Sequence, residues 1–258
     1  TIKATGYNGT PSKVQSCVER GECYRIKNNI SKSTKTSLLK QMGRKIYLNL
    51  KKAIQYIISI HIPIILIVFI PLALGWIYPN IFTPVHIIFL EIIMGPTCSI
   101  IYENEPMEDN LMLQKPRPLT TTFFNLNEIT ISIIQGLLIT LGLLFVYQYC
   151  AGENFSEKYT RTTIFLTLIA SNIFLTLENR SFYYSFLTTL KYRNNLLLTV
   201  IFITLLLLTI ILFLHPVAVF FHVTALSANQ LLVCTAAAAV AVFWVEIYKW
   251  FKRSRKKS

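Results

Sequence analysis

The stretch that decides the fold is residues 43–77, GRKIYLNLKKAIQYIISIHIPIILIVFIPLALGWI. Its first part is basic and carries apolar residues at positions 46, 50, 53, 54 and 57, a helical spacing, and its second part is almost entirely apolar. No turn signal separates the two parts, so the stretch predicts one long helix that starts in the cytoplasm and enters a membrane. The alternative is a shorter span whose basic flank extends its side chains toward the lipid headgroups.

Apolar runs of similar length recur along the 258 residues, of which 53% are hydrophobic and only 14% charged. Soluble domains have about 25% charged residues, and the apolar composition also excludes a disordered chain. Runs of about 17–25 residues can cross a bilayer core as helices, and the alternation typical of a membrane barrel is absent. We therefore predict an all-α membrane protein, a six-transmembrane-helix bundle with spans at 53–77, 82–102, 129–150, 162–177, 196–214 and 231–247.

The net charge of +13 is explained by the predicted topology. Of the 25 lysines and arginines, all but Lys158 and Arg161 lie before the first span, in the second and fourth connections, or after the last span. The positive-inside rule then places both the amino and the carboxy terminus in the cytoplasm. The basic tail at 252–257 directly follows a span, so the lipid bilayer, rather than nucleic acid, is its expected partner.

Residues 1–40 differ in character from the rest of the chain. They are rich in Gly, Asn, Ser, Thr and Lys, with little apolar periodicity, and we expect a weakly ordered basic segment there. Residues 41–258 make up the six-helix domain. Its second connection, 103–126, carries charges of both signs and three prolines, which predicts an ordered loop rather than a regular helix.

Ionisable side chains inside the spans are candidates for function, because placing one in lipid costs at least about 2.5–3.5 kcal/mol. Glu91 lies in the middle of the second span, His61 in the first span, and Glu178 at the end of the fourth. His86 precedes Glu91 by about one turn, and Glu246, near the end of the last span, is expected to be an interfacial charge.

The second span carries a helix break beside its carboxylate. Pro96 has no N–H to donate to the carbonyl of Ile92, and Gly95 lets the backbone bend. Such a break offers both charge and carbonyl oxygen to a cation inside the bilayer. We therefore predict a cation site with Glu91 as its metal ligand, the alternative being a packing kink with a protonated glutamic acid.

A second break is predicted at Pro63, which frees the carbonyl of Ser59 close to His61. His61 is then either part of the cation site or a hydrogen-bonded core histidine. The predicted cation-binding groups are Glu91, Glu178, His61 and the carbonyls of Ile92 and Ser59.

No residue of the chain is expected to be catalytic. The sequence has no Walker A loop, no GxSxG, no HExxH and no Rossmann fingerprint. No connection is long enough to fold a nucleotide-binding domain. We therefore expect no hydrolytic activity and no cofactor within these residues.

Several stretches resemble P-type cation-transporting ATPases, in particular bacterial members near the calcium pumps. Residues 43–59, GRKIYLNLKKAIQYIIS, resemble the stalk and fifth transmembrane helix of that family. Residues 90–100, LEIIMGPTCSI, resemble its sixth helix, residues 103–117 the loop that follows, and residues 178–181, ENRS, the end of its eighth helix. The resemblance covers about 41–250 and implies the stalk and last six helices of a pump.

The resemblance also implies roles for single residues. His61, Glu91 and Glu178 fall at cation-ligand positions of calcium pumps, with His61 in place of an asparagine. Two departures remove charge: Ile64 stands where those pumps have a glutamate, and Gly95 where the family has an ion-binding aspartate. The implied function is ATP-driven transport of a cation across a bacterial plasma membrane. The resemblance favours calcium, and a Glu91/His61 pair without the aspartate would also suit a proton or a transition metal.

The family's phosphorylated Asp-Lys-Thr-Gly motif, its nucleotide and actuator domains and its first four helices have no counterpart here. ATP and Mg²⁺ would be used by those domains, and the missing amino-terminal half of a pump is an expected partner. On this view the chain is inactive alone and comes from a truncated or frameshifted gene, a separate subunit being less favoured. The alternative is a non-enzymatic membrane remnant or scaffold; a passive channel would need more than one broken helix.

Overall fold

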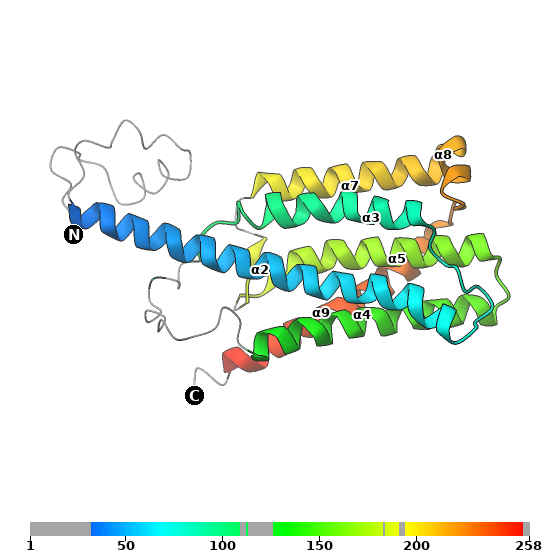
Figure 1. Cartoon of the computed structure of the whole chain (residues 1–258), viewed down its shortest axis with the longest axis horizontal. Helices are drawn as coiled ribbons and strands as arrows, with labels where there is room; N and C mark the ends of the chain where they lie inside the picture. The colour runs from blue at the N-terminus through cyan, green and yellow to red at the C-terminus, as the bar shows by residue number, and fades with distance from the viewer. Residues whose placement is uncertain (1–31, 109–111, 113–125, 183, 191–193, 255–258) are drawn as a thin grey trace. The chain divides into compact units, whose positions relative to one another are not determined.

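The computed structural model describes residues 32–108, 112, 126–182, 184–190 and 194–254 (Figure 1). The described residues form helices joined by turns and irregular segments, without a strand. The chain divides into two units, residues 1–48 with 107–115 and residues 49–106 with 116–258. The predictions for residues 1–31 and for most of the loop 103–126 fall outside the described residues.

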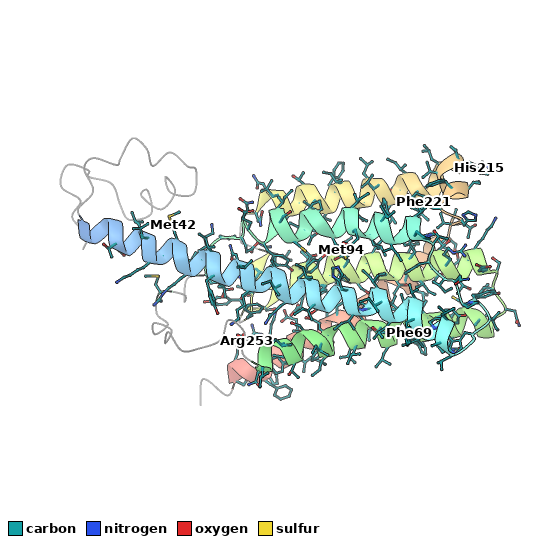
Figure 2. All side chains as sticks on the ribbon, viewed as in Figure 1. Met42, Phe69, Met94, His215, Phe221 and Arg253 are labelled. Atoms are coloured by element: carbon teal, nitrogen blue, oxygen red, sulfur yellow. The ribbon has the colours of Figure 1, made fainter. Side chains whose placement is uncertain are left out.

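Helix α2 (Lys32–Ala73) is continuous and contributes to both units. It confirms that one helix carries both the basic and the apolar part of the stretch at 43–77. Residues 32–40, expected to be weakly ordered, belong to this helix. They contain neither glycine nor proline, and extending an existing helix by a turn costs far less than starting one. In the first unit, α2 exposes apolar side chains, among them Met42 (Figure 2).

Within the part of the chain that the structure describes, six helical segments are long and apolar enough to cross a membrane, which confirms the predicted fold class. They are α2, α3 (Pro84–Pro96) continued by the π-helix η2 (Thr97–Ile101), α4 (Leu126–Gly152), α5 (Glu157–Glu178), α7 (Asn195–Phe213) and α9 (Ala228–Ser254). Two short helices, α6 (Phe186–Thr189) and α8 (His215–Phe220), lie in the connections. Successive spans of the second unit run in alternating directions (Figure 1).

The first connection is longer than predicted. The span expected to reach Ile77 ends as α2 at Ala73, because Gly75 adopts a φ of +62° in the left-handed region that favours glycine. The Trp76 N–H then donates to the Pro71 carbonyl and closes the helix end. Residues 74–83 join α2 to α3, rather than residues 78–81 as the predicted spans imply.

Only one of the two predicted helix breaks interrupts a helix. Helix α2 continues through Pro63, as transmembrane helices can where neighbouring helices support them. At the other position α3 ends at Pro96, and the next five residues form the π-helix η2. π-Helices are rare, and the single π-helical turns that occur within longer helices are often found at functional sites.

Helix α5 is the most deeply buried span and packs against α4 and α9. Its hydroxyl side chains donate back to carbonyl groups four residues earlier, which satisfies them inside an apolar bundle. These residues are Thr160, Thr162, Thr163, Thr167, Ser171 and Thr176. Phe165 of α5 joins Met94 and Phe221 in one buried apolar cluster.

Two glycines bring α4 close to its neighbours. A Cβ at Gly136 would lie 2.8 Å from the Ser59 carbonyl oxygen and 2.8 Å from the Ile62 Cβ of α2. A Cβ at Gly142 would lie 3.1 Å from the Ala241 Cβ of α9. Small residues permit this approach, which drives helix association in membranes where no hydrophobic force acts between helices.

Candidate cation site

Helices α2 and α3 bring His61 and Glu91 together. The His61 Nε2 lies 3.3 Å from the Glu91 Oε1, and the two side chains are 38% and 52% exposed. Both residues lie in the middle of apolar helices, where an exposed polar pair meets hydrocarbon unless other protein covers it. The structure therefore brings these two candidate residues together and leaves both side chains partly exposed.

The hydrogen bonding of His61 fixes what it presents to Glu91. Its Nδ1 lies 2.8 Å from the Ile57 carbonyl oxygen, which can only accept, so Nδ1 carries a proton. In a neutral imidazole the Nε2 lone pair then faces the carboxylate oxygen. Two acceptors at this separation require a shared proton or a cation between them.

The backbone near Glu91 is irregular. Pro96 cannot donate to the Ile92 carbonyl, and the Thr97 N–H donates to Met94 instead. The Ile92 carbonyl therefore lacks the donor that a non-proline residue at position 96 would supply. Gly95 is exposed, and a Cβ at this position would have no atom within 4 Å.

The other predicted carbonyl has a different environment. The Ser59 carbonyl faces α4, since it would lie 2.8 Å from a Cβ at Gly136. The Ser59 hydroxyl donates to the Gln55 carbonyl at 2.9 Å and lies 3.1 Å from the Ser132 carbonyl. Ser59 thus lies where α2 packs on α4.

A buried polar layer links α2, α4 and α5, and sequence reasoning missed it. The Tyr56 hydroxyl donates to the Asn172 Oδ1, and Gln135 lies 3.3 Å from the Ser59 hydroxyl and 3.4 Å from the Asn179 Oδ1. All five side chains are buried. The sequence does contain a signal for this layer. Amide and hydroxyl side chains within apolar spans need hydrogen-bond partners in lipid, so they indicate contacts with other helices.

Glu178, predicted as a cation ligand, lies against a lysine of α9. The Lys249 Nζ lies 2.6 Å from the Glu178 Oε1, and the side chains are 5% and 0% exposed. The same ammonium group donates to the Glu178 main-chain carbonyl at 2.7 Å. Glu246, expected at the interface, accepts from the Phe186 N–H at 2.6 Å. The sequence indicated Lys249 only as one of the basic residues after the last predicted span.

A second buried ion pair fixes the segment after η2. The Arg180 Nε lies 2.8 Å from the Glu105 Oε1, and both side chains are 1% exposed. Asn194 donates to the other Glu105 carboxylate oxygen at 2.9 Å, and Asn49 donates to the Glu105 carbonyl at 2.8 Å. This network ties α2, α5 and α7 to one loop residue.

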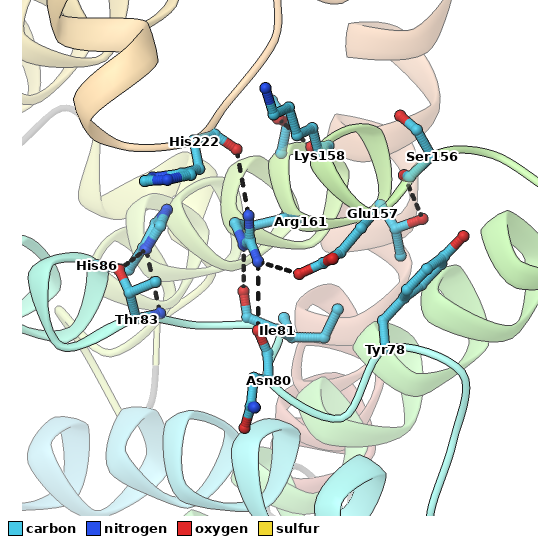
Figure 3. Close-up of polar contacts among 12 residues, drawn as sticks. Tyr78, Asn80, Ile81, Thr83, His86, Ser156, Glu157, Lys158, Arg161 and His222 are labelled. Atoms are coloured by element: carbon cyan, nitrogen blue, oxygen red, sulfur yellow. Dashed lines mark hydrogen bonds and ion pairs between the residues drawn. The ribbon is translucent and has the colours of Figure 1, made fainter.

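At the ends of the helices away from Glu105, Arg161 joins two connections (Figure 3). Its guanidinium group donates to the carbonyls of Ile81, Asn80 and His222 and pairs with Glu157. Arg161 is therefore an anchor for two connections rather than a surface charge. His86 is a core histidine: it is fully buried against aromatic rings, and its Nδ1 lies 2.7 Å from the Thr83 hydroxyl.

The described residues hold no group of three His, Cys, Asp or Glu side chains that could bind a metal ion together. Among these residues, Glu91 and His61 thus form a pair that no third His, Cys, Asp or Glu side chain joins. Glu178 is separately engaged by Lys249.

Comparison with known families gives this arrangement a context. The family model described as "Cation transporting ATPase, C-terminus" matches residues 79–251, more than half of the chain. The chain belongs to this family. The matched region of this cation-transporting ATPase C-terminal domain begins in the first connection and ends within α9. Both the family and the apolar helices show that the domain is an integral membrane protein.

Curated relatives of this C-terminal domain are much longer proteins. Calcium-transporting ATPase 1 of Lactococcus lactis is 29% identical over 216 residues, 82% of this chain and 24% of the relative. The endoplasmic reticulum-type calcium-transporting ATPase 3 of Arabidopsis thaliana is 26% identical over 215 residues, 72% of this chain and 21% of the relative. The chain thus spans about a quarter of the length of these relatives.

Proposed function

We propose that the chain is the membrane portion of an ATP-driven cation pump and that Glu91 and His61 supply part of its cation site. The observation that carries this proposal is the approach of the His61 Nε2 to the Glu91 Oε1, 3.3 Å apart, in the middle of two spans. A cation between them would satisfy both groups at once. The Ile92 carbonyl, to which Pro96 cannot donate, would add an oxygen of the kind that hard cations prefer.

Calcium is the cation that we propose. The printed names of the relatives describe calcium-transporting ATPases, and a carboxylate with main-chain carbonyls is a calcium-type donor set. An imidazole nitrogen is more typical of a transition metal. Mn²⁺ is therefore the second cation worth measuring.

The exposed side of the His61–Glu91 pair must be shielded from lipid by other protein. A half-exposed carboxylate in hydrocarbon costs at least about 2.5–3.5 kcal/mol. We propose that further membrane segments of the pump pack on this face and complete the coordination, and that its other domains use ATP and Mg²⁺. On this proposal, both termini are cytoplasmic and the membrane is a bacterial plasma membrane.

A non-enzymatic membrane scaffold is the second candidate function. The observation that favours it is the empty space at Gly95, where the resemblance implies an aspartate. A site without that carboxylate offers a divalent cation one negative charge instead of two. A scaffold would hold partner helices through the same exposed face without binding a cation.

Calcium binding to the purified 258-residue chain in lipid nanodiscs separates these candidates. We expect Glu91→Gln to weaken binding by at least about tenfold, equivalent to about 1.4 kcal/mol. Glu153→Gln is the matched control, because Glu153 is exposed just beyond the end of α4. Calcium bound by the native chain with an affinity that Glu91→Gln leaves unchanged would refute the cation site and leave the scaffold.

A further inference from the structure

Two buried cysteines approach one threonine at the end of the bundle where α4 ends and α9 begins. Cys150 of α4 and Cys234 of α9 are each 1% exposed, and both thiols are free. The Cys234 thiol donates to the Thr163 main-chain carbonyl, with its Sγ 3.7 Å from that oxygen. The Cys150 thiol interacts with the Thr163 side chain and with Cys234 itself. Two helices therefore bring their thiols to the same turn of α5.

The packing of α4 on α9 accounts for this approach. The two helices run in opposite directions (Figure 1), and a Cβ at Gly142 of α4 would lie 3.1 Å from the Ala241 Cβ of α9. Cys150 lies eight residues after Gly142, and Cys234 lies seven residues before Ala241. At about 1.5 Å per residue, these separations are about 12 Å and about 10.5 Å along antiparallel helices. The two cysteines thus lie at the same level of the bundle.

Tyr159, one turn before Thr163, covers both thiols. Its side chain packs against the apolar cluster that contains Cys150 and against the smaller cluster that contains Cys234. The Tyr159 ring is partly exposed, and its centroid lies 4.3 Å from that of Phe155. Because α5 begins at Glu157, only its first turn separates the thiols from the end of the bundle.

We propose that Cys150 and Cys234 are a redox pair, which an oxidant converts into an intramolecular disulfide bond that fastens α9 to α4. Thiols and disulfides are both uncharged, so the reaction leaves no charge buried in the apolar bundle. On the proposed topology, this end of the bundle faces away from the cytoplasm, where disulfides persist. The chemistry itself does not depend on that topology or on the cation site.

The oxidant is a low-molecular-weight disulfide. One cysteine sulfur attacks it and forms a mixed disulfide, and the sulfur that leaves takes up the proton of the attacking thiol. The second cysteine sulfur then attacks the first, which forms the S–S bond and releases the other half of the oxidant as a thiol. Two electrons and two protons pass from the cysteines to the oxidant.

Cysteines that only fill space make a different prediction. Free cysteine commonly behaves as a small apolar residue, and thiols buried in apolar surroundings are inert. Such thiols would stay reduced or would form separate mixed disulfides, and no bond would join α4 to α9. The product of oxidation therefore distinguishes the two roles.

The test uses the 258-residue chain in lipid nanodiscs, with Cys17, Cys23 and Cys98 replaced by serine and 2-hydroxyethyl disulfide as the oxidant. After alkylation and proteolysis, mass spectrometry should find one peptide pair that joins Cys150 to Cys234. The Tm should rise by at least about 4 °C and return to its first value on reduction. Absence of the linked pair, or a linked pair without a rise in Tm, would overturn the proposal.

Three further chains make the result specific. C150S in the same background should give neither the linked pair nor the rise in Tm. A chain that keeps Cys98 and Cys234 instead should give no link, because Cys98 lies on η2 at the other end of the bundle (Figure 1). Y159A should form the same bond faster, since it uncovers the thiols. If the serine background does not fold, the linked pair is sought in the native chain, where its absence is equally decisive.

Discussion

Replacing Gly136 by alanine tests the packing that positions the candidate site. The added methyl group would lie 2.8 Å from the Ser59 carbonyl oxygen, 2.8 Å from the Ile62 Cβ and 3.1 Å from the Ile62 Cδ1. The first two atoms belong to the backbone or are fixed to it, so neither can rotate away. Helix α2 must then move away from α4 by several tenths of an ångström.

The expected change in stability of Gly136→Ala is the difference between two opposing effects. Overpacking a close contact costs about 1–3 kcal/mol, and the fixed contact atoms place Gly136→Ala in the upper half of that range. Alanine in a helix is favoured over glycine by about 1 kcal/mol. We therefore expect a net loss of stability of about 1–2 kcal/mol.

Two other glycines of α4 are matched controls. A Cβ at Gly152 has no atom within 4 Å, so Gly152→Ala should be neutral or slightly stabilising. The methyl group added by Gly142→Ala would lie 3.1 Å from the Ala241 Cβ, so the stability of this variant should lie between those of Gly136→Ala and Gly152→Ala. Unfolding in mixed micelles, followed by circular dichroism during a denaturant titration, gives the three stabilities. A Gly136→Ala chain as stable as Gly152→Ala would refute the close packing of α2 on α4.

Further changes test the candidate site and the two buried arginines. Gly95→Asp adds a carboxylate where there is open space. The calcium affinity, measured by equilibrium dialysis, should therefore rise by about tenfold or more. An unchanged affinity would mean that position 95 does not face the cation. Arg180→Met leaves the carboxylate of Glu105 buried and uncompensated, and should cost about 3–5 kcal/mol in the same unfolding assay. Arg161→Met should cost less, about 1.5–3 kcal/mol, because Glu157 is 49% exposed and water can solvate it. The reverse order of the two arginine variants would contradict this account of burial.

The six spans could be predicted because a helix in lipid must satisfy its own backbone, so an apolar run of sufficient length is enough. The helix ends were less predictable, since polar residues extend helices beyond the apolar run. Helix α5 begins after Ser156, whose side chain accepts from the Tyr159 N–H, and Asn194 caps α7 in the same way. The π-helix after Pro96 also has no signal beyond the Gly-Pro pair itself.

The candidate site was predictable only in part. Glu91 and His61 are recognisable as ionisable residues in apolar runs, and the structure places them together. The partner of Glu178 is 71 residues away in sequence, and Lys249 looked like one more basic residue after a span. Charge counting assigns a lysine to a side of the membrane, but only packing shows whether its ammonium group lies in water or against a carboxylate.

The most direct test of the central claim asks whether Glu91 and His61 contact the same cation. Mn²⁺ bound to the native chain, with histidine labelled with ¹⁵N, can be examined by pulsed electron paramagnetic resonance. The account predicts a hyperfine coupling to a histidine nitrogen that is lost in His61→Gln and kept in His86→Gln, and loss of Mn²⁺ binding in Glu91→Gln. Bound Mn²⁺ whose signal is unchanged by His61→Gln would contradict the account.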